Sequence, residues 1–344
     1  MSGRDYRVVV LPGDGIGHEV TAAAVQVMRA VAGRSGFGLS LEEHPCGAFH
    51  YRAAGEAISG AALAAVDGAD ATLFGAAGWP DIRDGNGVEI APQIDLRERF
   101  QLFAGLRPVR LFAGVPGPLA RGHVDMLVIR EQTEGLFAGR HDAPGTDPDM
   151  AQDRMVVTRA GCERLFALAF EQARRRRRHV TLFDKANVLR SQALMRLVFD
   201  EVAEGYPDVE AARLYIDNAA MLMVTDPGRF DVVVMENQFG DIVSEIAAGI
   251  GGGLGIAPSA DLGPGHAVFQ PCHGTAPDIA GMGVANPVAA ILSAAMLLEH
   301  LGEAGASGAV RGAVETVLRE GPRTRDLGGA AGTRDVADAI ERAL

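Results

Sequence analysis

The sequence has 344 residues, of which 48% are hydrophobic and 22% charged, and its formal net charge is −12. This profile is typical of a soluble globular protein, and the length predicts two domains or one large α/β unit. The acidic balance argues against nucleic acid or an anionic membrane as a partner. No apolar run suits a membrane span or a signal peptide, and the three widely spaced cysteines indicate reduced thiols. We therefore expect a cytoplasmic protein.

Short runs rich in β-branched and apolar residues alternate with segments of helical periodicity. The runs that predict strands are residues 8–11, 71–74, 126–129, 155–158, 180–183, 211–216 and 232–235. Between two of them, Leu194, Leu197 and Val198 share one face of a predicted helix. Alternation of this kind predicts an α/β fold with a largely parallel sheet.

Three further segments have a distinctive composition. Residues 139–153 are rich in Gly, Pro and Asp, which predicts an exposed loop or arm. The five arginines at 174–178 end a predicted helix, and a solvated helix terminus is favoured there over a nucleic-acid patch. Asn286 and Pro287 predict a helix start. The almost wholly apolar residues 289–301 predict that this helix is buried or lies at an interface.

The first motifs that could carry chemistry are a glycine-rich string and three arginines. The string GDGIG, at residues 13–17, follows the first predicted strand, but its spacing is not GxGxxG. A nucleotide loop and a tight structural turn are therefore both open. Arg97, Arg107 and Arg130 together predict a dicarboxylate site, because guanidinium forks bind carboxylates through paired hydrogen bonds. Each arginine taken singly is typical of a surface or salt-bridge residue.

Acidic residues suggest a metal site. Asp241 and Glu245 are four residues apart, so both carboxylates share one face if the segment is helical. Hard divalent cations prefer oxygen ligands, and Asp217, after the predicted strand 211–216, could supply a third. A solvated acidic helix face is the alternative interpretation.

Two other features lie near the ends of predicted elements. Lys185 follows the strand predicted at 180–183, where α/β sheets usually bind ligands. A nearby metal or arginine cluster would lower the pKa of this lysine and make it a candidate base; without one it is an ordinary surface lysine. The string HGTAPD, at residues 273–278, could hold an adenosine, since its acidic group suits a free ribose 2′-hydroxyl, or could be a simple turn.

These motifs occur together, in an order that resembles the isocitrate/isopropylmalate dehydrogenase family of metal-dependent β-decarboxylating dehydrogenases. The resemblance covers nearly the whole chain. The strings that carry it are GDGIG (13–17), LRERFQLFAGLRPVRLFAGVP (96–116), IREQTEGL (129–136), DKANVLR (184–190), FDVVVMENQFGDIVSEIAAGIGGGLGIAPSA (230–260) and HGTAPDIAGMGVANPVAAILSAAMLLEH (273–300).

The resemblance implies an isopropylmalate dehydrogenase-like fold with two α/β domains and a cofactor site that is not of the Rossmann type. The large cofactor-binding domain would comprise residues 1–105 and 255–344. The small domain would comprise residues 106–254 and carry a dimerisation arm at about 131–158. The active site would lie between the domains and be shared across a homodimer.

The resemblance also implies a role for each motif. Arg97, Arg107 and Arg130 would bind the substrate carboxylates, and Lys185 from the partner subunit would be the catalytic base. Asp217 from the partner would act with this base and would bind Mg²⁺ or Mn²⁺ together with Asp241 and Glu245. NAD would lie against a set of residues near the end of the chain: His273, Gly274, Thr275, Ala276, Asp278 and Asn286.

The implied reaction is oxidation of a 2-hydroxyacid by NAD followed by loss of its β-carboxylate as CO₂. Three positions depart from the family pattern: Phe137 replaces a tyrosine, Glu245 an aspartate, and Gln270 a glutamate. Gln93 and Ile94 stand where isopropylmalate enzymes carry a leucine pair that contacts the substituent on the third carbon. The resemblance therefore implies a malate that bears a small or polar substituent, with the string RPVRLFAGVP closest to tartrate and D-malate relatives.

Two alternatives remain at this level. The protein could dehydrogenate its substrate without efficient decarboxylation, or it could be a non-catalytic regulatory subunit. The presence of the arginines, the lysine and the metal carboxylates favours an enzyme.

Overall fold

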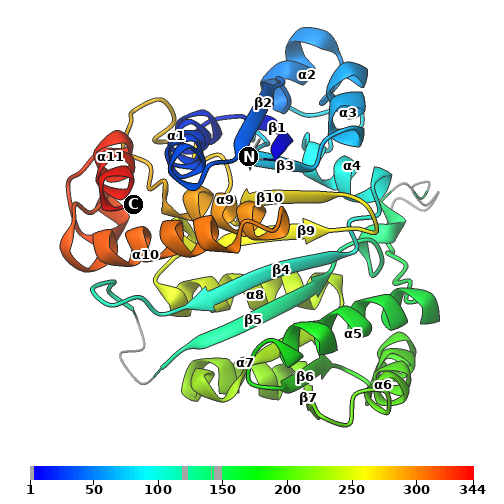
Figure 1. Ribbon diagram of the computed structural model, residues 1–344. Coiled ribbons are helices and arrows are strands. Elements are labelled where there is room, and N and C mark those ends of the chain that lie inside the picture. Colours follow the sequence, from blue (N-terminus) through cyan, green and yellow to red (C-terminus); the bar gives the residue numbers. More distant parts are fainter. Residues whose placement is uncertain (1–3, 118–122, 141, 143–148) are drawn as a thin grey trace.

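The computed structural model describes residues 4–117, 123–140, 142 and 149–344. Within these residues the strands form one ten-stranded sheet that runs through the whole molecule (Figure 1). In spatial order its strands are β2 (Gly38–Glu43), β1 (Asp5–Gly13), β3 (Ala71–Ala76), β10 (Ala267–Pro271), β9 (Pro258–Leu262), β4 (Ala104–Arg110), β5 (Asp125–Glu131), β8 (Val232–Met235), β6 (His179–Asp184) and β7 (Glu210–Tyr215).

The two ends of the sheet are parallel and its centre is antiparallel. Among the described strands, β10 pairs antiparallel with β9, β9 with β4, and β4 with β5. The other six pairings are parallel. The prediction of a largely parallel α/β sheet is therefore confirmed, but the sequence pattern did not reveal the antiparallel centre that joins the two halves.

The upper half in Figure 1 contains both ends of the chain, with helices on both faces of the sheet. One face is covered by α1 (Gly17–Ser35), α9 (Val288–His300), α10 (Ala304–Glu320) and α11 (Thr333–Ala343). The opposite face is covered by α3 (Gly60–Asp67) and α4 (Pro92–Arg99), with α2 (Ala48–Ala54) leading into α3. Successive residues of β1 explain this layering, since Val8 packs in the first core and Val9 in the second.

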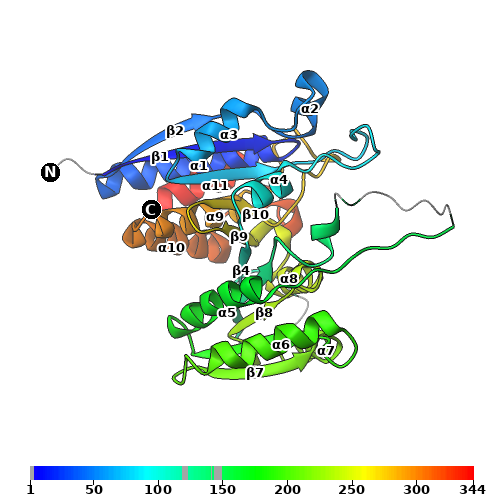
Figure 2. The ribbon, with the colours of Figure 1, turned by 90° about the vertical axis from the view of Figure 1, so that its right-hand side faces the viewer.

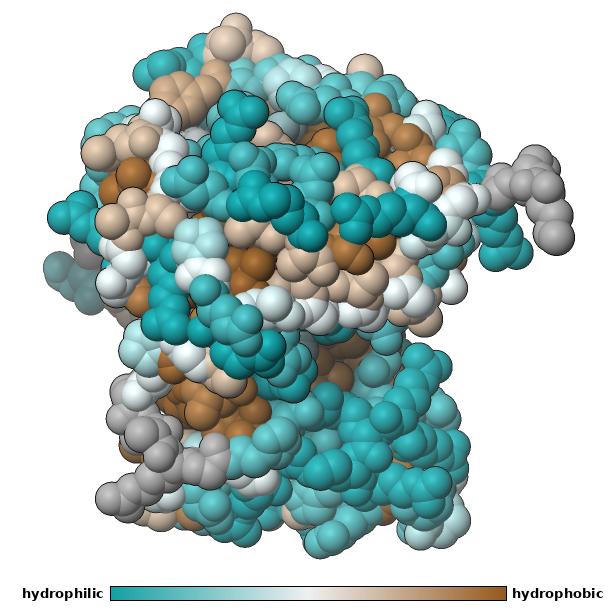
Figure 3. Space-filling model, turned by 60° about the vertical axis from the view of Figure 1, so that its left-hand side comes forward, coloured by the Kyte–Doolittle hydropathy of each residue, from teal (hydrophilic) through white to brown (hydrophobic). Residues whose placement is uncertain are grey.

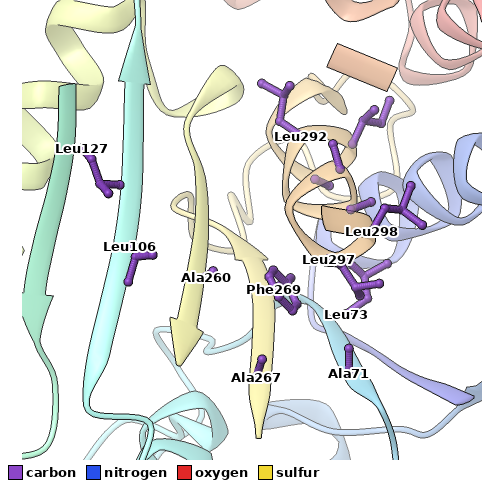
Figure 4. Packing of buried hydrophobic residues seen from close by; sticks show 14 of the residues in the cluster. Ala71, Leu73, Leu106, Leu127, Ala260, Ala267, Phe269, Leu292, Leu297 and Leu298 are labelled. Atoms are coloured by element: carbon purple, nitrogen blue, oxygen red, sulfur yellow. The ribbon is translucent and has the colours of Figure 1, made fainter. Parts of the chain in front are cut away.

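The lower half repeats this arrangement. Its one face is covered by α5 (Arg159–Arg174) and α6 (Arg190–Ala203), and the other by α7 (Ile216–Thr225) and α8 (Asn237–Gly251). The core under α5 and α6 is continuous with the core under α1 and α9. Figure 4 shows this continuity, from Leu127 and Leu106 through Ala260 and Phe269 to Leu73. Single turns of 3-10 helix occur at η1 (Phe137–Gly139), η2 (Pro227–Arg229), η3 (Leu254–Ile256) and η4 (Arg325–Leu327).

Several predicted segments are confirmed and others are corrected. The helix α9 is buried along most of its length, and the Asn286 side chain accepts a hydrogen bond from the Val288 N–H at 3.1 Å. The strand predicted at 155–158 is wrong: Val156 makes only an isolated bridge with Gly135, and Thr158 caps α5 instead. The shared helix face was also misassigned, because Leu197 is 51% exposed.

The interpretation of the arginine run as a solvated helix end is also wrong in part. Arg176 donates to Asp231 at 2.8 Å and to Asp125 at 2.6 Å, and Arg177 donates to backbone oxygens of the neighbouring strands. These arginines therefore tie the start of β6 to β5 and β8. Only part of the predicted arm is described, since residues 141 and 143–148 lie outside the described residues. Residues 149–153 are exposed, and in Figure 2 they run far from the body of the molecule.

The surface and the domain boundaries can be related to this architecture. On the face in Figure 3, hydrophobic residues gather beside the recess between the upper and lower parts and in several patches on the upper part. Among the described helices, each is too short or too polar to cross a lipid bilayer.

The expected domain boundary at 105/106 falls inside β4, and the boundary at 254/255 falls inside η3. The division into two domains stays a prediction.

Candidate active site

Three arginines from separate elements line one open cavity of about 360 Å³. Arg97 comes from α4, Arg107 from β4 and Arg130 from β5. Their exposed fractions are 7%, 8% and 2%, so they are not the surface residues that each would be if taken singly. The structure thus brings together the three arginines that the sequence predicted as a dicarboxylate site.

The internal partners of these arginines do not balance their charges fully. Arg130 donates two hydrogen bonds to Asn237 Oδ1, at 3.0 and 2.7 Å, and forms an ion pair with Asp241. Arg107 donates to Ser244 Oγ at 2.5 Å, while its buried Nε has no hydrogen-bond partner among the described residues. Unpaired donors in a cavity are what an anionic ligand would satisfy.

The electrostatics of the cluster support the same conclusion. Burial, followed by the positive charges of Arg97 and Arg107, lowers the pKa of Arg130 to about 9. Burial also acts to lower the pKa of Arg107, but the surrounding acidic groups, Asp241 among them, raise it overall. Bound carboxylates would offset the mutual repulsion of three guanidinium groups that are shielded from water.

Asp241 and Glu245 line the same cavity from α8, so the predicted helix and the shared face are confirmed. The helix begins where Glu236 accepts hydrogen bonds from the N–H groups of Gln238 and Phe239. Burial raises the pKa of Glu245, Arg107 lowers it, and the charge of Asp241 raises it again. Two carboxylates one helical turn apart that line the same cavity suit a bound cation.

Lys185 and Asp217 lie elsewhere. Lys185 follows β6 and donates to Asp217 Oδ1 at 2.7 Å, and neither residue lines the cavity that holds the arginines. This hydrogen bond lowers the pKa of Asp217. Among the described residues of one chain, His, Cys, Asp and Glu side chains do not come together in groups of three that could hold a metal ion. Asp241 and Glu245 offer the hard oxygens that Mg²⁺ needs, but they form an incomplete set in one chain.

Phe137 and Gln93 complete the wall around the arginines. The Phe137 ring, in η1, lies 5.4 Å from the guanidinium carbon of Arg130. Gln93 lies one turn before Arg97 on α4, and its buried Oε1 has no hydrogen-bond partner among the described residues. Ile94 lines the cavity beside it, and Cys272 lines it opposite. Burial raises the pKa of the Cys272 thiol to about 11, so the thiol carries no charge at neutral pH.

The glycine-rich string and the HGTAPD segment are in direct contact. The Ile16 N–H donates to the Thr275 carbonyl at 3.0 Å. Gly15 has φ +56°, and a Cβ there would lie 2.2 Å from the same carbonyl oxygen, which explains the glycine. The loop at 13–17 therefore supports the 273–278 segment, as a structural turn would.

The predicted NAD-binding residues surround this contact. His273 and Gly274 line the cavity, while Ala276, at φ +41°, and the exposed Asp278 continue the loop. Burial lowers the pKa of His273, whose buried Nε2 has no partner among the described residues. The Asn286 amide is already engaged, since its oxygen accepts from the Val288 N–H just before α9 and its nitrogen donates to Asp326 at 3.0 Å.

Sequence reasoning missed Asp261, on β9, which lies behind the cavity wall. Arg97 donates to this carboxylate at 2.8 Å, and the carboxylate is 1% exposed. The available signal was an aspartate between the apolar residues Ala260 and Leu262 of the strand PSADL. Asn237 and Ser244 were also missed, although both lie on the helical segment that carries Asp241.

Comparison with known proteins agrees with these features. A family model described as isocitrate/isopropylmalate dehydrogenase matches residues 7–340. The chain is 43% identical to the 3-isopropylmalate dehydrogenase of Mycobacterium tuberculosis, over 98% of this chain and 100% of that protein. It is 42% identical to the 3-isopropylmalate dehydrogenase of Pectobacterium atrosepticum, over 98% of each chain.

Solved structures show the same relationship. An isocitrate dehydrogenase from Methylococcus capsulatus superposes with a TM-score of 0.90 at 36% identity, over 98% of this chain and 99% of that one. A β-decarboxylating dehydrogenase from Thermococcus kodakarensis superposes with a TM-score of 0.83 at 38% identity, over 98% and 96%. The fold predicted from the motifs is thus confirmed, and the chain belongs to the isocitrate/isopropylmalate dehydrogenase family of decarboxylating hydroxyacid dehydrogenases.

Proposed function

We propose that the protein oxidatively decarboxylates a 3-carboxy-2-hydroxyacid, a substituted malate, with NAD⁺ and Mg²⁺ or Mn²⁺. The observation that carries this proposal is the cavity in which three buried arginines face two carboxylates of one helix. Arginines suit the two carboxylates of the substrate, and the acidic helix face suits a divalent cation. The two rival functions, dehydrogenation alone and a regulatory subunit, have no support in the comparisons.

Each residue then has a defined task. Arg97, Arg107 and Arg130 hold the substrate carboxylates, and Asp241 and Glu245 hold the cation. Burial keeps water from the guanidinium groups, so their hydrogen bonds to the substrate are stronger than on a surface. The cation, when bound, polarises the 2-hydroxyl and later the 2-carbonyl group.

Lys185 and Asp217 of one subunit complete the site of the other in this proposal. Their hydrogen bond fixes the position of the lysine Nζ, and the lysine in its neutral form can take the proton of the substrate hydroxyl and then release a proton to Asp217 or water. Exposed apolar side chains favour a second copy as the partner: α7 carries Met221, 55% exposed, and Val224, 48% exposed, α8 carries Ile242, 56% exposed, and the loop after β6 carries Val188, 67% exposed. We therefore propose a homodimer.

His273 and Gly274 line the cavity and would hold the adenosine part of NAD⁺, and the cofactor, when bound, would supply the hydride acceptor. The buried His273 Nε2, which has no hydrogen-bond partner among the described residues, gives this part of the cavity a polar group for a ligand. Exposed Asp278 suits the free ribose hydroxyls of NAD⁺ better than the extra phosphate of NADP⁺. We also propose the two-domain division at 105/106 and 254/255 and a cytoplasmic location, consistent with three free cysteines.

The test is a screen of purified protein with NAD⁺, Mg²⁺ or Mn²⁺ and a panel of 2-hydroxyacids. We place 3-isopropylmalate first, because the relatives carry that name, and then tartrate, D-malate and isocitrate. NADH and CO₂ in equal amounts are expected for one of them. NADH without CO₂, or full activity after exhaustive EDTA treatment, would contradict the proposal.

A further inference from the structure

Asp261 has a position that the proposed reaction does not yet use. It lies on β9, is 1% exposed, and does not line the substrate cavity. Three side chains nevertheless donate hydrogen bonds to its two oxygens. Arg97 Nε reaches Oδ2 at 2.8 Å, Gln270 Nε2 reaches the same oxygen at 2.8 Å, and Gln132 Nε2 reaches Oδ1 at 3.0 Å.

The sheet register explains why this carboxylate faces the arginines. Asp261 on β9 lies opposite Gly105 on β4, and Gly105 lies opposite Arg130 on β5. Residues opposite one another in a sheet point to the same face, so Asp261 and Arg130 flank a glycine on the side of the cavity. A Cβ at Gly105 would lie 2.3 Å from Gln132 Nε2. The glycine therefore leaves the space through which Gln132 reaches Asp261.

The geometry fixes the Nε edge of the Arg97 guanidinium, and its terminal nitrogens have no hydrogen-bond partner in the described part of the chain. Nε is held by Asp261 behind the wall, while Arg97 itself lines the cavity. A planar guanidinium held at Nε presents its terminal nitrogens in a set direction. Gln132, just after β5, and Gln270, on β10, donate to Asp261 from two sides, so that direction is set before a ligand binds.

We infer that Asp261 is a positioning residue: it holds Arg97 in the orientation that receives a substrate carboxylate, and Gln132 and Gln270 hold Asp261. This inference rests on the proposed function for the identity of the ligand. It also predicts the direction in which the affinity for an anion changes when the charge of Asp261 is removed. Replacing Asp261 by a neutral residue makes the site more positive, so charge alone would tighten the binding of an anion, whereas loss of orientation would weaken it.

The experiment compares Asp261→Asn with Asp231→Asn. Asp231 is a matched control, since it is also 1% exposed and also accepts from an arginine Nε at 2.8 Å, but it pairs with Arg176 away from the cavity. The affinity for D-malate is measured by calorimetry with Mg²⁺ and without NAD⁺. The Asp261→Asn variant is expected to bind about 10- to 100-fold more weakly, the range typical of residues that orient a binding group. Asp231→Asn is expected to bind as the wild type does.

Steady-state kinetics should show the same difference between the two variants, with a raised KM and a smaller change in kcat for Asp261→Asn.

The exchange variant Asp261→Asn/Gln270→Glu moves the carboxylate to the neighbouring strand and is expected to recover part of the affinity. If Asp261→Asn does not fold, Gln132→Met keeps the charge and removes one brace, and should weaken binding in the same direction. Unchanged or tighter D-malate binding in these variants would overturn the inference. Wild-type protein that binds D-malate but converts none of the panel would overturn the proposed function instead.

Discussion

Phe137 is the single residue whose chemistry differs most from what the family resemblance implies. The usual tyrosine is thought to protonate the product after CO₂ leaves, and a phenyl ring has no hydroxyl to donate. The ring nevertheless lies at the cavity, 5.4 Å from the Arg130 guanidinium carbon. Our hypothesis is that this absence slows the step after decarboxylation.

We predict that Phe137→Tyr raises kcat on the true substrate by about tenfold or more and leaves KM nearly unchanged, because a positioned acid contributes about 10²–10⁴-fold. The solvent deuterium isotope effect on kcat should fall at the same time. A kcat that is unchanged or lower would show that the phenyl ring serves packing or substrate fit instead.

Asp278 gives a second prediction for a single side chain. It is exposed in the loop that follows Thr275, and the string HGTAPDI contains no lysine or arginine. A carboxylate that faces the 2′-phosphate of NADP⁺ should cost a few kcal/mol, or about 10²-fold in kcat/KM. Steady-state kinetics with both cofactors measure the ratio of kcat/KM with NAD⁺ to kcat/KM with NADP⁺. The Asp278→Asn variant should reduce this ratio. Equal kcat/KM values for the two cofactors in the wild type would refute the predicted preference for NAD⁺.

At the scale of the elements, the contact between α8 and β5 sets the position of Asp241 and Glu245, the two carboxylates of α8 that we propose bind the metal. Gly240, on α8, faces Arg130, and a Cβ there would lie 2.6 Å from Arg130 Cγ and 2.7 Å from its Cβ. These atoms are close to the backbone and cannot swing away. We predict that Gly240→Ala lowers the free energy of unfolding by about 1–3 kcal/mol, as overpacking does elsewhere.

The same helix provides the control. A Cβ at Gly249 would meet no atom within 4 Å, so Gly249→Ala should stabilise the protein by about 0.5–1 kcal/mol. Chemical denaturation of both variants gives the two values. The Gly240→Ala variant should also need more Mg²⁺ for half-maximal activity, because α8 carries Asp241. Similar stabilities of the two variants would contradict the close approach of α8 to β5.

Local patterns predicted the elements whose own residues determine their structure. The apolar runs at β1, β3, β6 and β8 are strands, and α9 is the buried helix that its composition predicted. The strand prediction for residues 155–158 failed because a β-branched run forms a strand only beside another strand, and Val156 pairs only with Gly135, in an isolated bridge. The antiparallel strands β4 and β9 were missed for the converse reason. Their pairing joins residues far apart in the chain, which no local period encodes.

The candidate site divides in the same way. Arg97, Arg107 and Arg130 were found because their residue type suits a dicarboxylate and their order matches the family strings. Asp261 was missed because its role depends on the β9–β4–β5 register, which is a property of the assembled sheet.

At the scale of the whole molecule, the separation of Lys185 from Arg130 makes a shared site testable. In a mixed dimer of Lys185→Ala and Arg130→Ala subunits, one of the two sites would contain both wild-type residues. Random mixing should therefore restore about a quarter of the wild-type activity. The measurement is the activity of the two inactive variants after joint refolding, with the mixed dimer quantified by differential tags. Mixed dimers without activity would show that each subunit works with its own Lys185.

The place of β10 in the sheet also has a consequence for protein synthesis. β3 pairs on one side with β1 and on the other with β10, which follows more than half of the chain's length later. At about 5–20 residues per second, the ribosome needs about 10–40 s to supply that second partner. During this interval the apolar edge of β3 stays open in the nascent chain, while β5, β6 and β8 can already pair. The half of the molecule whose synthesis begins first is therefore the half that finishes folding last.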